Sequence, residues 1–476
     1  MPKVTLFQLN DTHGYLEAHP ELSWTADGPA LSILGGFARI AEVLNTARME
    51  SPGAVLAFDN GDTFHGTPAL ALSKGEAMLP VLNALGLSAM TGHWDFAYGP
   101  VQTAYLAGML TYPFLAANCH ALTEAGPHFQ ATTVCRADNL SIGVIGVAAT
   151  ILDKTMPASF SEGLRFTDGI EETRAHATNL RAAGCDLIIV LSHLGLPQDC
   201  ALAKAVDGLD VILSGHTHNR LEKPWIVNDT IIMQSGCHGS FLGRLDLTIG
   251  DGRITGYDHR LIPISADIAE DPDVAELVAQ AIAPVAGMRA QIVGTTDRIL
   301  HRGTCLDAPM DDVLLAAIAQ AANTRIAFSN GWRYGAPIPI GPVTLHDLWC
   351  IIPTAPPVET VDLTGAEIIA MMEDNLEATF ACDAFNQRGG YVKRFCGLSF
   401  NVKLENPVGH RIEQAFGPDN DCLDPKTTYR AAFVTQQGVP ARYGRNRRRA
   451  GVAAVAALLS WFGAKTQIRP GRIRIV

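Results

Sequence analysis

The sequence lacks the features that mark a membrane protein, a secreted protein or a nucleic-acid-binding protein. Its longest uncharged apolar stretch near the C-terminus, Ala450 to Ala464, is too short to span a bilayer. Its 48 acidic residues outnumber 36 basic ones, and the net charge of −12 argues against a nucleic acid or a membrane surface as partner. No basic region followed by an apolar run precedes the first strand-like segment, so we expect no signal peptide and a cytoplasmic location.

Cysteine is scarce and scattered along the chain. The ten cysteines form no Cys-x-x-Cys pair, so a structural zinc site with closely spaced ligands is not expected. In a cytoplasmic protein most of these thiols should be reduced and buried. The fold must therefore be held by apolar cores, for which the apolar content of 47% is sufficient.

The first half of the chain alternates strand-like apolar runs with helix-like segments, which predicts an α/β fold. A length of 476 residues predicts two or three domains. Helix-like stretches run from Gly36 to Arg48 and from Ile170 to Ala183. Polar residues gather where the runs stop, and ligands in α/β sheets bind at the carboxyl ends of strands. The predicted strands are Val4 to Leu9, Ala54 to Phe58, Leu140 to Val147, Asp186 to His193 and Asp210 to His218.

A change of pattern near residue 265 predicts the domain organisation. Residues 1–265 form one domain, an acidic and Ala-rich helical segment at 266–290 links it onward, and residues 291–476 form the second domain. In the second domain Thr364 and Glu367 have the spacing of a helix capping box. The arginine cluster from Arg442 to Arg449 is expected to be a solvated helix start, with an anion-facing patch as the alternative.

Five short motifs place a carboxylate or an imidazole directly after an apolar run: NDTHG, DNGDT, TGHWD, LSHLG and SGHTH. Oxygen and nitrogen donors of this kind suit Mn, Zn, Fe, Co or Ni better than Ca or Mg. Seven donors are too many for one tetrahedral ion and suit two ions that share a bridging carboxylate. We expect the other histidines, His65 among them, to be ordinary packed or surface residues. The candidate ligands are Asp11, His13, Asp62, His93, His193, His216 and His218.

The order of these motifs resembles the 5′-nucleotidase superfamily of calcineurin-like metallophosphoesterases. The resemblance implies a four-layer αββα sandwich that carries two divalent metal ions, with Mn the first choice, followed by a C-terminal α/β domain that contacts substrate. It also implies that Asp62 bridges the two ions. One ion would then be held by Asp11, His13, Asp62 and His218, and the other by Asp62, His93, His193 and His216.

The stretch GHWDFAYG departs from the superfamily pattern GNHEFDYG. His93 stands at a metal-binding Asn, Trp94 at the catalytic His, and Ala97 at the Asp that orients that His. The SoxB branch, whose members are thiosulfohydrolases, has a similar GHWEFxYG stretch, and the likeness continues through residues 61–78, 330–335 and 373–398. The resemblance implies a SoxB-like hydrolase that uses metal-bound hydroxide on an anionic ester or thiosulfonate, with Asp62 and His93 in catalytic positions.

The loss of the histidine has a chemical consequence for the leaving group. Protonation of a poor leaving group by a positioned acid typically contributes about 10²–10⁴-fold in rate. A thiolate or persulfide leaves without that help, so Trp94 favours a substrate with an acidic leaving group over an alkyl phosphate. Asp95 is the one nearby carboxylate that could replace the acid, although the resemblance implies a structural role for it. The alternative for Trp94 is a simple core aromatic.

The second domain provides candidate substrate contacts. Arg333, in SNGWRYG, matches the superfamily's substrate-binding Arg, and its guanidinium would bind a phosphate or sulfonate oxygen pair and serve in catalysis. Asn330 and Trp332 are weaker candidates for the same role. Val392 and Gln436 stand where 5′-nucleotidases have the two phenylalanines that sandwich a purine. The loss of both argues against a nucleoside pocket.

Two other functions remain open at this stage. One is a general phosphoesterase, such as a 5′-nucleotidase or a cyclic phosphodiesterase, with an altered proton donor. The other is a non-catalytic metal-binding protein, which the complete ligand set argues against. The expected partner is a small anionic substrate or a sulfur-carrier protein, with no nucleic acid and no membrane.

Overall fold

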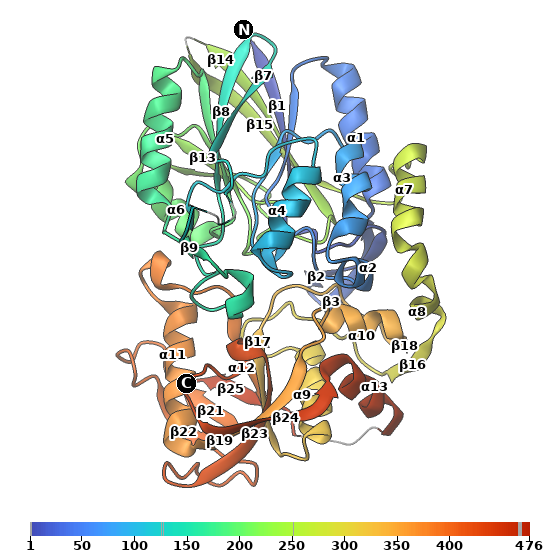
Figure 1. Cartoon of the computed structure of the whole chain (residues 1–476), viewed down its shortest axis with the longest axis vertical. Helices are drawn as coiled ribbons and strands as arrows, with labels where there is room; N and C mark the ends of the chain where they lie inside the picture. The colour runs from blue at the N-terminus through green and yellow to red at the C-terminus, as the bar shows by residue number, and fades with distance from the viewer. Residues whose placement is uncertain (1, 125, 127, 251, 465–468) are drawn as a thin grey trace. The chain divides into compact units, whose positions relative to one another are not determined.

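The computed structural model describes residues 2–124, 126, 128–250, 252–464 and 469–476, and the chain forms two compact units (Figure 1). The first unit comprises Met1–Glu21 and Ser32–Pro284, and the second comprises Leu22–Leu31 and Val285–Val476. The functional domain limits expected at residues 265 and 290 stay a prediction. Within the described part of the chain, no helix is both long enough and apolar enough to cross a membrane.

The first unit is built on two large sheets, of which one has five strands in the order β15-β14-β1-β4-β5. The predicted strand at Val4 to Leu9 is confirmed as β1, which runs parallel to β4 with Leu6 opposite Leu56. On its other side β1 pairs antiparallel with β14. The strands are β1 (Lys3–Leu9), β4 (Val55–Asp59), β5 (Ala89–Met90), β14 (Phe241–Gly250) and β15 (Arg253–Pro263).

The other sheet has six strands in the order β12-β13-β11-β10-β8-β7. Strands β8, β10, β11 and β13 are parallel, so their carboxyl ends lie at one edge. The strand predicted at Asp210 to His218 was too long, because β11 ends at Ser214 and both His216 and His218 then take positive φ angles. The strands are β7 (Thr132–Ala137), β8 (Leu140–Val147), β10 (Leu187–Ser192), β11 (Val211–Ser214), β12 (Trp225–Val227) and β13 (Thr230–Met233).

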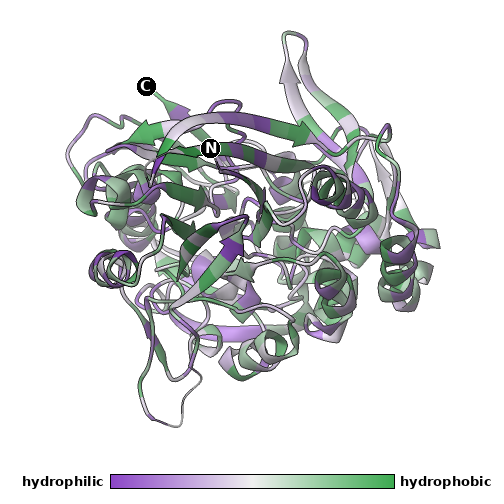
Figure 2. Ribbon diagram, turned by 90° about the horizontal axis from the view of Figure 1, so that it is seen from above, coloured by the Kyte–Doolittle hydropathy of each residue, from purple (hydrophilic) through white to green (hydrophobic). Residues whose placement is uncertain are grey.

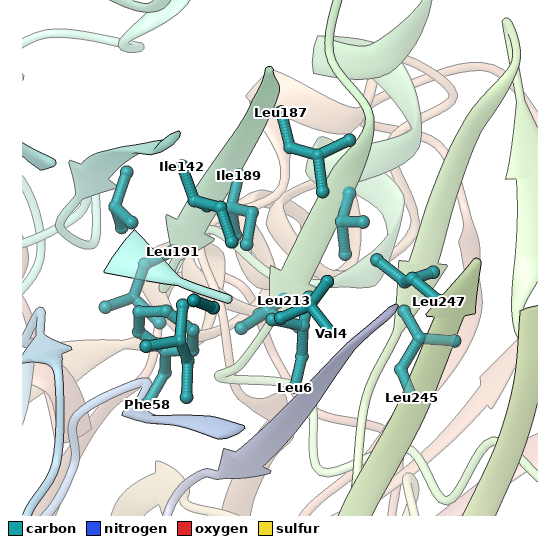
Figure 3. Close-up of a cluster of buried hydrophobic side chains, with 14 of the residues drawn as sticks. Val4, Leu6, Phe58, Ile142, Leu187, Ile189, Leu191, Leu213, Leu245 and Leu247 are labelled. Atoms are coloured by element: carbon teal, nitrogen blue, oxygen red, sulfur yellow. The ribbon is translucent and has the colours of Figure 1, made fainter. Parts of the chain in front are cut away.

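The two sheets pack face to face around one apolar core (Figure 3). Leu6 and Phe58 from the first sheet meet Ile189 and Leu213 from the second, and all four side chains are 0% exposed. Burial of each such side chain stabilises the fold by about 1.5–3 kcal/mol. This core fixes the strands, and with them the loops at their carboxyl ends.

Helices cover the outer faces of the sandwich, as the four-layer prediction requires. Helix α5 (Ile170–Ala182) lies on β8 and β10, and α6 (Leu196–Ala205) lies on β11. On the other face α1 (Phe37–Glu50) contacts β4 and packs against α7 (Pro272–Ile282). Figure 2 shows green and purple residues alternating along the helices, as expected for helices with one apolar face. The αββα architecture is thereby confirmed.

The second unit is built on a five-stranded sheet in the order β20-β17-β23-β19-β24. Helix α11 (Gly365–Phe380) opens with the predicted capping box of Thr364 and Glu367. Helices α9 (Pro309–Ala321) and α13 (Ala454–Ala464) pack against each other. The strands are β17 (Ile326–Gly331), β19 (Pro357–Thr364), β20 (Tyr391–Cys396), β23 (Thr428–Val434) and β24 (Arg445–Ala453).

The arginine cluster is not a helix start, so that prediction was wrong. Its residues from Arg445 onward form the edge strand β24, and the helix begins only at Ala454. Arg445 lies opposite Asp362 and Arg449 opposite Glu359 of β19. Opposite charges directly across a strand pair stabilise a sheet, which explains the strand.

Candidate metal centre

The predicted ligands all lie just beyond the carboxyl ends of strands in the first unit. In each case the preceding strand is buried and its following loop turns back over the end of the sheet. Parallel strands end at a common edge, and so residues far apart in the sequence meet there. Asp11 and His13 follow β1, Asp62 follows β4, His93 follows β5, His193 follows β10, and His216 and His218 follow β11.

The structure brings all seven residues together in two overlapping groups. In each group the ligand atoms lie within 4.8 Å of one another, and Asp62 belongs to both. These groups coincide with the two sets that the sequence resemblance implied, although their role as ligands stays a prediction. One group is Asp11, His13, Asp62 and His218; the other is Asp62, His93, His193 and His216.

In the first group two imidazoles face each other across the site. Nε2 of His13 is 3.2 Å from Nε2 of His218. Nε2 of His218 is also 3.3 Å from Oδ1 of Asp11, and Nε2 of His13 is 3.6 Å from Oδ2 of Asp62. Two nitrogen donors and two carboxylate oxygens that converge in this way form a donor set that suits a divalent transition metal.

In the second group a hydrogen bond from the ring nitrogen that points away from the carboxylates fixes the orientation of His193. Its Nδ1 lies 2.6 Å from the backbone oxygen of Asn60, which can only accept, so Nδ1 donates and Nε2 faces the carboxylates. That Nε2 is buried and has no hydrogen-bond partner among the described residues, at 3.4 Å from Asp62 and 3.6 Å from Asp11. Buried polar atoms are normally satisfied, and a metal ion would satisfy this one. The residues present therefore fit two metal ions.

Five of the seven ligands have left-handed backbone conformations. The φ angles are 52° for Asp11, 48° for His13, 56° for Asp62, 72° for His216 and 58° for His218. Such angles are uncommon outside glycine and cost free energy unless the surroundings impose them. Here the tight loops turn the side chains back over the strand ends, where they converge.

The charges of the cluster favour a cation. Burial alone would raise the pKa of Asp62, but the surrounding imidazoles of His93, His193 and His13 hold it well below its usual value. Burial opposes protonation of His193, yet the carboxylates of Asp62 and Asp11 raise its pKa to about 10. A metal ion would replace the proton that this histidine otherwise holds.

Trp94 lies at the edge of the site and its side chain is immobilised. The indole is 6% exposed and stacks on His65, with ring centroids 4.4 Å apart and planes 20° apart. Phe160 packs edge-on against it at 5.5 Å. The backbone N–H of Trp94 donates to Oδ1 of Asp62 at 2.6 Å. The residue therefore supports the Asp62 carboxylate through its main chain, and its role in place of a catalytic histidine stays a prediction.

His65 was expected to be an ordinary histidine, but it lies beside the centre. Its Nδ1 is 3.5 Å from Nδ1 of His13, and burial lowers its pKa to about 3. At neutral pH His65 is uncharged and therefore is not a proton donor of the catalytic kind. Its position three residues after Asp62 was the available sequence signal.

Asp95 serves the backbone rather than the substrate. Its two oxygens accept four backbone N–H groups at 2.8–3.0 Å, from Asp62, Thr63, Phe64 and His93. Burial and the Asp62 carboxylate raise the pKa of Asp95, but a proton there would compete with these donors. Asp95 thus holds the two metal-binding loops together.

An Asp95→Ala variant should be strongly destabilised. It would leave four buried N–H groups without an acceptor, each at about 1–3 kcal/mol. We expect a loss of several kcal/mol in unfolding free energy, measured by urea denaturation of the metal-free protein. Asp95→Asn, which keeps one carbonyl oxygen, should lose less. Equal stability of the alanine variant and the wild type would contradict this role.

The predicted substrate residues of the second unit lie at the carboxyl end of β17, with Asn330 in the strand and Trp332 and Arg333 directly after it. The guanidinium of Arg333 donates to the Gly390 carbonyl at 3.0 Å and lies 5.2 Å from the centre of the Tyr391 ring. Trp332 is buried, and its Nε1 donates to Gln437 at 3.3 Å. Asn330 is partly exposed near the end of the strand. Their contact with a substrate stays a prediction.

The two positions of the lost purine sandwich do not offer a stacking surface. Val392 is 0% exposed and belongs to the core of the second unit. Gln436 is exposed and carries no ring. This placement agrees with the expectation that the chain does not stack a nucleobase between these positions.

Lys393 is a buried cation that sequence reasoning missed. Its Nζ donates to the carbonyl oxygens of Gln437 and Gly438, and its side chain is among the buried ones. Burial, together with the charge of Arg442, lowers the pKa of Lys393 to about 7. Alternation along β20 gave no signal, because the strand is buried on both faces from Val392 onward.

The titration of Lys393 should appear in the pH dependence of stability. A lysine in the unfolded chain has a pKa near 10.4, so between about pH 7 and 10 the unfolded state binds a proton that the folded state has lost. The unfolding free energy of the wild type relative to Lys393→Met should therefore rise with pH, by up to about 1.4 kcal/mol per unit. Urea unfolding of both proteins at several pH values measures this, and parallel curves would contradict it.

Comparison with known proteins supports the relationship that the site suggests. Residues 282–435 match the family model of the 5′-nucleotidase C-terminal domain. The trifunctional nucleotide phosphoesterase YfkN of Bacillus subtilis (strain 168) is 26% identical over 482 residues, which cover 90% of this chain and 31% of YfkN. The chain thus spans about a third of the length of that relative.

Solved structures share the complete fold. The sulfate thiohydrolase SoxB of Thermus thermophilus matches with a TM-score of 0.90 at 24% identity, over 100% of this chain and 97% of SoxB. A 5′-nucleotidase precursor, also from Thermus thermophilus, matches with a TM-score of 0.87 at 23% identity, over 100% of this chain and 99% of that protein. The predicted metallophosphoesterase sandwich followed by a 5′-nucleotidase-type domain is therefore confirmed.

Proposed function

Because residues 282–435 match the 5′-nucleotidase C-terminal domain and the whole chain has the fold of SoxB and of a 5′-nucleotidase, we propose that this chain is a metal-dependent hydrolase of the 5′-nucleotidase superfamily, a SoxB-like enzyme acting on an anionic ester or a thiosulfonate. The reaction class follows from the family and the metal centre. The substrate class follows from the proton donor that the site does not have. The family model, the relatives and the fold are equally compatible with phosphoesters, so the choice rests on the site itself.

The residues divide the work between metal binding and orientation. The two ligand groups would hold two divalent ions, for which we propose Mn, and such ions would supply a metal-activated water whose pKa falls from 15.7 to about 7. Asp62 joins the two ligand groups, and Asn60 and Trp94 orient His193 and Asp62 through backbone hydrogen bonds. Arg333 is proposed to bind the oxygens of the substrate anion.

The observation that supports an acidic leaving group is the environment of Trp94. The indole occupies the position of the expected acid and is held by His65 and Phe160. Asp95 is occupied by four N–H donors, and the low pKa of His65 leaves it unprotonated at neutral pH. None of these neighbours can protonate an alkoxide, whereas a thiolate or persulfide needs no protonation to leave.

Arg333 gives a separate test of the substrate's charge. Replacement of Arg333 by Ala should raise KM for the anionic substrate by about 10- to 100-fold, because a hydrogen bond to a charged group is worth about 1.5–3 kcal/mol. Arg333→Lys should recover part of this loss, since it keeps the charge but not the fork geometry. Steady-state kinetics with metals at saturation measures both, and unchanged KM values would remove Arg333 from the binding site.

The second candidate is a general phosphoesterase, favoured by the name of the relative YfkN, a nucleotide phosphoesterase. It predicts turnover of unactivated phosphate esters, nucleotides included, and so requires a proton donor other than the residues around Trp94.

For the SoxB-like function we further propose that the substrate is a small anion or a sulfur-carrier protein, and that the protein acts on it in the cytoplasm.

A paired assay separates the two candidates. The protein is stripped of metal, reconstituted with Mn or Zn, and given p-nitrophenyl phosphate, AMP and S-sulfocysteine in parallel. Sulfate release together with no release of phosphate from AMP supports the SoxB-like proposal. Phosphate release from AMP at a comparable rate supports the phosphoesterase. If no substrate turns over with both metals bound, the hydrolase proposal itself fails.

A further inference from the structure

A second set of metal-binding side chains lies next to the dinuclear centre. Glu21, Cys237 and His238 are all buried, and their donor atoms lie within 4.8 Å of one another. Glu21 belongs to β2 (Ala18–Thr25), while the other two belong to the loop between β13 and β14. None of the three takes part in the dinuclear groups.

The distances within this cluster match the edges of a small tetrahedron. Sγ of Cys237 is 3.4 Å from Nδ1 of His238, and that Nδ1 is 3.6 Å from Oε2 of Glu21. In a tetrahedral zinc site, with metal–nitrogen and metal–oxygen bonds near 2.0 Å and metal–sulfur bonds near 2.3 Å, donors are about 3.3–3.6 Å apart. Two of the three separations therefore already match ligand spacing, and the third lies within 4.8 Å.

The neighbours of Glu21 are compatible with a cation at Oε2. Arg220 pairs with the other oxygen, Oε1, and thereby holds the carboxylate plane. Ser240 donates to Oε2 at 2.5 Å, and the imidazole of His238 lies on the same oxygen at 3.6 Å. Burial opposes ionisation of Glu21, but its hydrogen-bonded neighbours hold the pKa at about 2, so the group is a carboxylate.

His238 has the backbone signature of the dinuclear ligands. Its φ is 59°, in the left-handed region that five of those ligands also occupy. Its backbone N–H donates to the carbonyl of Asp11 at 2.7 Å, so the loop that carries Cys237 and His238 supports a residue of the main centre. A strained non-glycine residue of this kind is a marker of function when its side chain is well placed.

We propose that Glu21, Cys237 and His238 bind a third divalent metal ion, and that this ion is zinc. A thiolate selects zinc over manganese, whereas the seven oxygen and nitrogen ligands nearby do not. Burial raises the pKa of the Cys237 thiol, so binding releases the thiol proton to solvent as the Zn–S bond forms. Water or another donor completes the tetrahedron. The ion would fix the loop behind Asp11.

Cobalt reports this site separately from the dinuclear centre. Metal-free protein titrated with Co²⁺ should develop a near-ultraviolet thiolate-to-cobalt charge-transfer absorption with the amplitude of one thiolate ligand per chain. The dinuclear groups contain no sulfur and cannot produce it. Added Zn²⁺ should remove the absorption. Cys237→Ser should abolish it and lower the zinc content by one ion per chain in elemental analysis.

Two further variants keep the test decisive. Cys185→Ser, at a buried cysteine elsewhere in the same unit, should keep the absorption. His238→Asn, with a side chain that tolerates positive φ, should keep the fold and weaken cobalt binding by at least about tenfold. Absence of the absorption in the wild type, or its persistence in Cys237→Ser, overturns the proposal. Absence of the absorption in the wild type would overturn only the third site, because elemental analysis counts the two ions of the dinuclear centre separately.

Discussion

An Asp62→Asn variant will lose both ions of the dinuclear centre and with them all measurable hydrolysis. Asp62 is the one residue common to both ligand groups, and its carboxylate lies within 3.3–3.6 Å of ring nitrogens of His13, His93 and His193. A neutral amide removes the negative charge that two cations would share. Without metal, the hydroxide available at neutral pH falls by about 10⁸-fold, since the pKa of water returns from about 7 to 15.7.

The measurement is elemental analysis after reconstitution, together with hydrolysis of p-nitrophenyl phosphate and S-sulfocysteine. Asp59→Asn is the matched control. Asp59 is the buried last residue of the strand that precedes the same loop, and burial raises its pKa to about 7, so its carboxyl carries only part of a negative charge at neutral pH. That control should keep both ions. Full occupancy of the dinuclear centre in Asp62→Asn would remove the bridging role from Asp62.

The sequence predicted this centre because the physics that assembles it is local. Buried strands are visible as apolar runs, parallel strands end at a common edge, and the ligands stand directly after those runs. Strand β8 was predicted with its observed bounds, and the capping box of Thr364 and Glu367 was predicted from spacing alone. Local patterns of this kind do not depend on distant parts of the chain.

The features that the sequence did not reveal depend on contacts between distant segments. The arginine run of β24 became a strand because Asp362 and Glu359 lie across from it. The cluster of Glu21 with Cys237 and His238 joins β2 to the loop between β13 and β14. These segments are more than 200 residues apart, so no short motif in the sequence indicates the cluster. His65 looked ordinary because its partners, His13 and Trp94, come from other loops. Apolar periodicity reports burial but does not report partners.

The second large effect concerns the proton donor, which the double variant Trp94→His with Ala97→Asp should restore. Trp94 opens the 3₁₀ turn Trp94–Phe96, and the Ala97 N–H donates back to the Trp94 carbonyl at 2.8 Å. Side chains three residues apart eclipse in a 3₁₀ turn, so Asp at 97 can hold His at 94 in one orientation. We expect hydrolysis of an unactivated phosphate monoester to increase by about 10²–10⁴-fold.

The single variant Trp94→Phe separates proton donation from space. It removes the indole from His65 without adding an acid. Both variants lose the packing of the indole. This loss of stability is smaller than the about 3–5 kcal/mol that a Trp→Ala change costs in a core. If Trp94→Phe gains as much activity as the double variant, the indole only blocks the substrate. If the double variant keeps both metals and gains nothing, leaving-group protonation does not limit this site. A gain confined to the double variant, with a new pH-dependent limb in kcat from the introduced imidazole, identifies Trp94 as the residue that restricts this enzyme to acidic leaving groups.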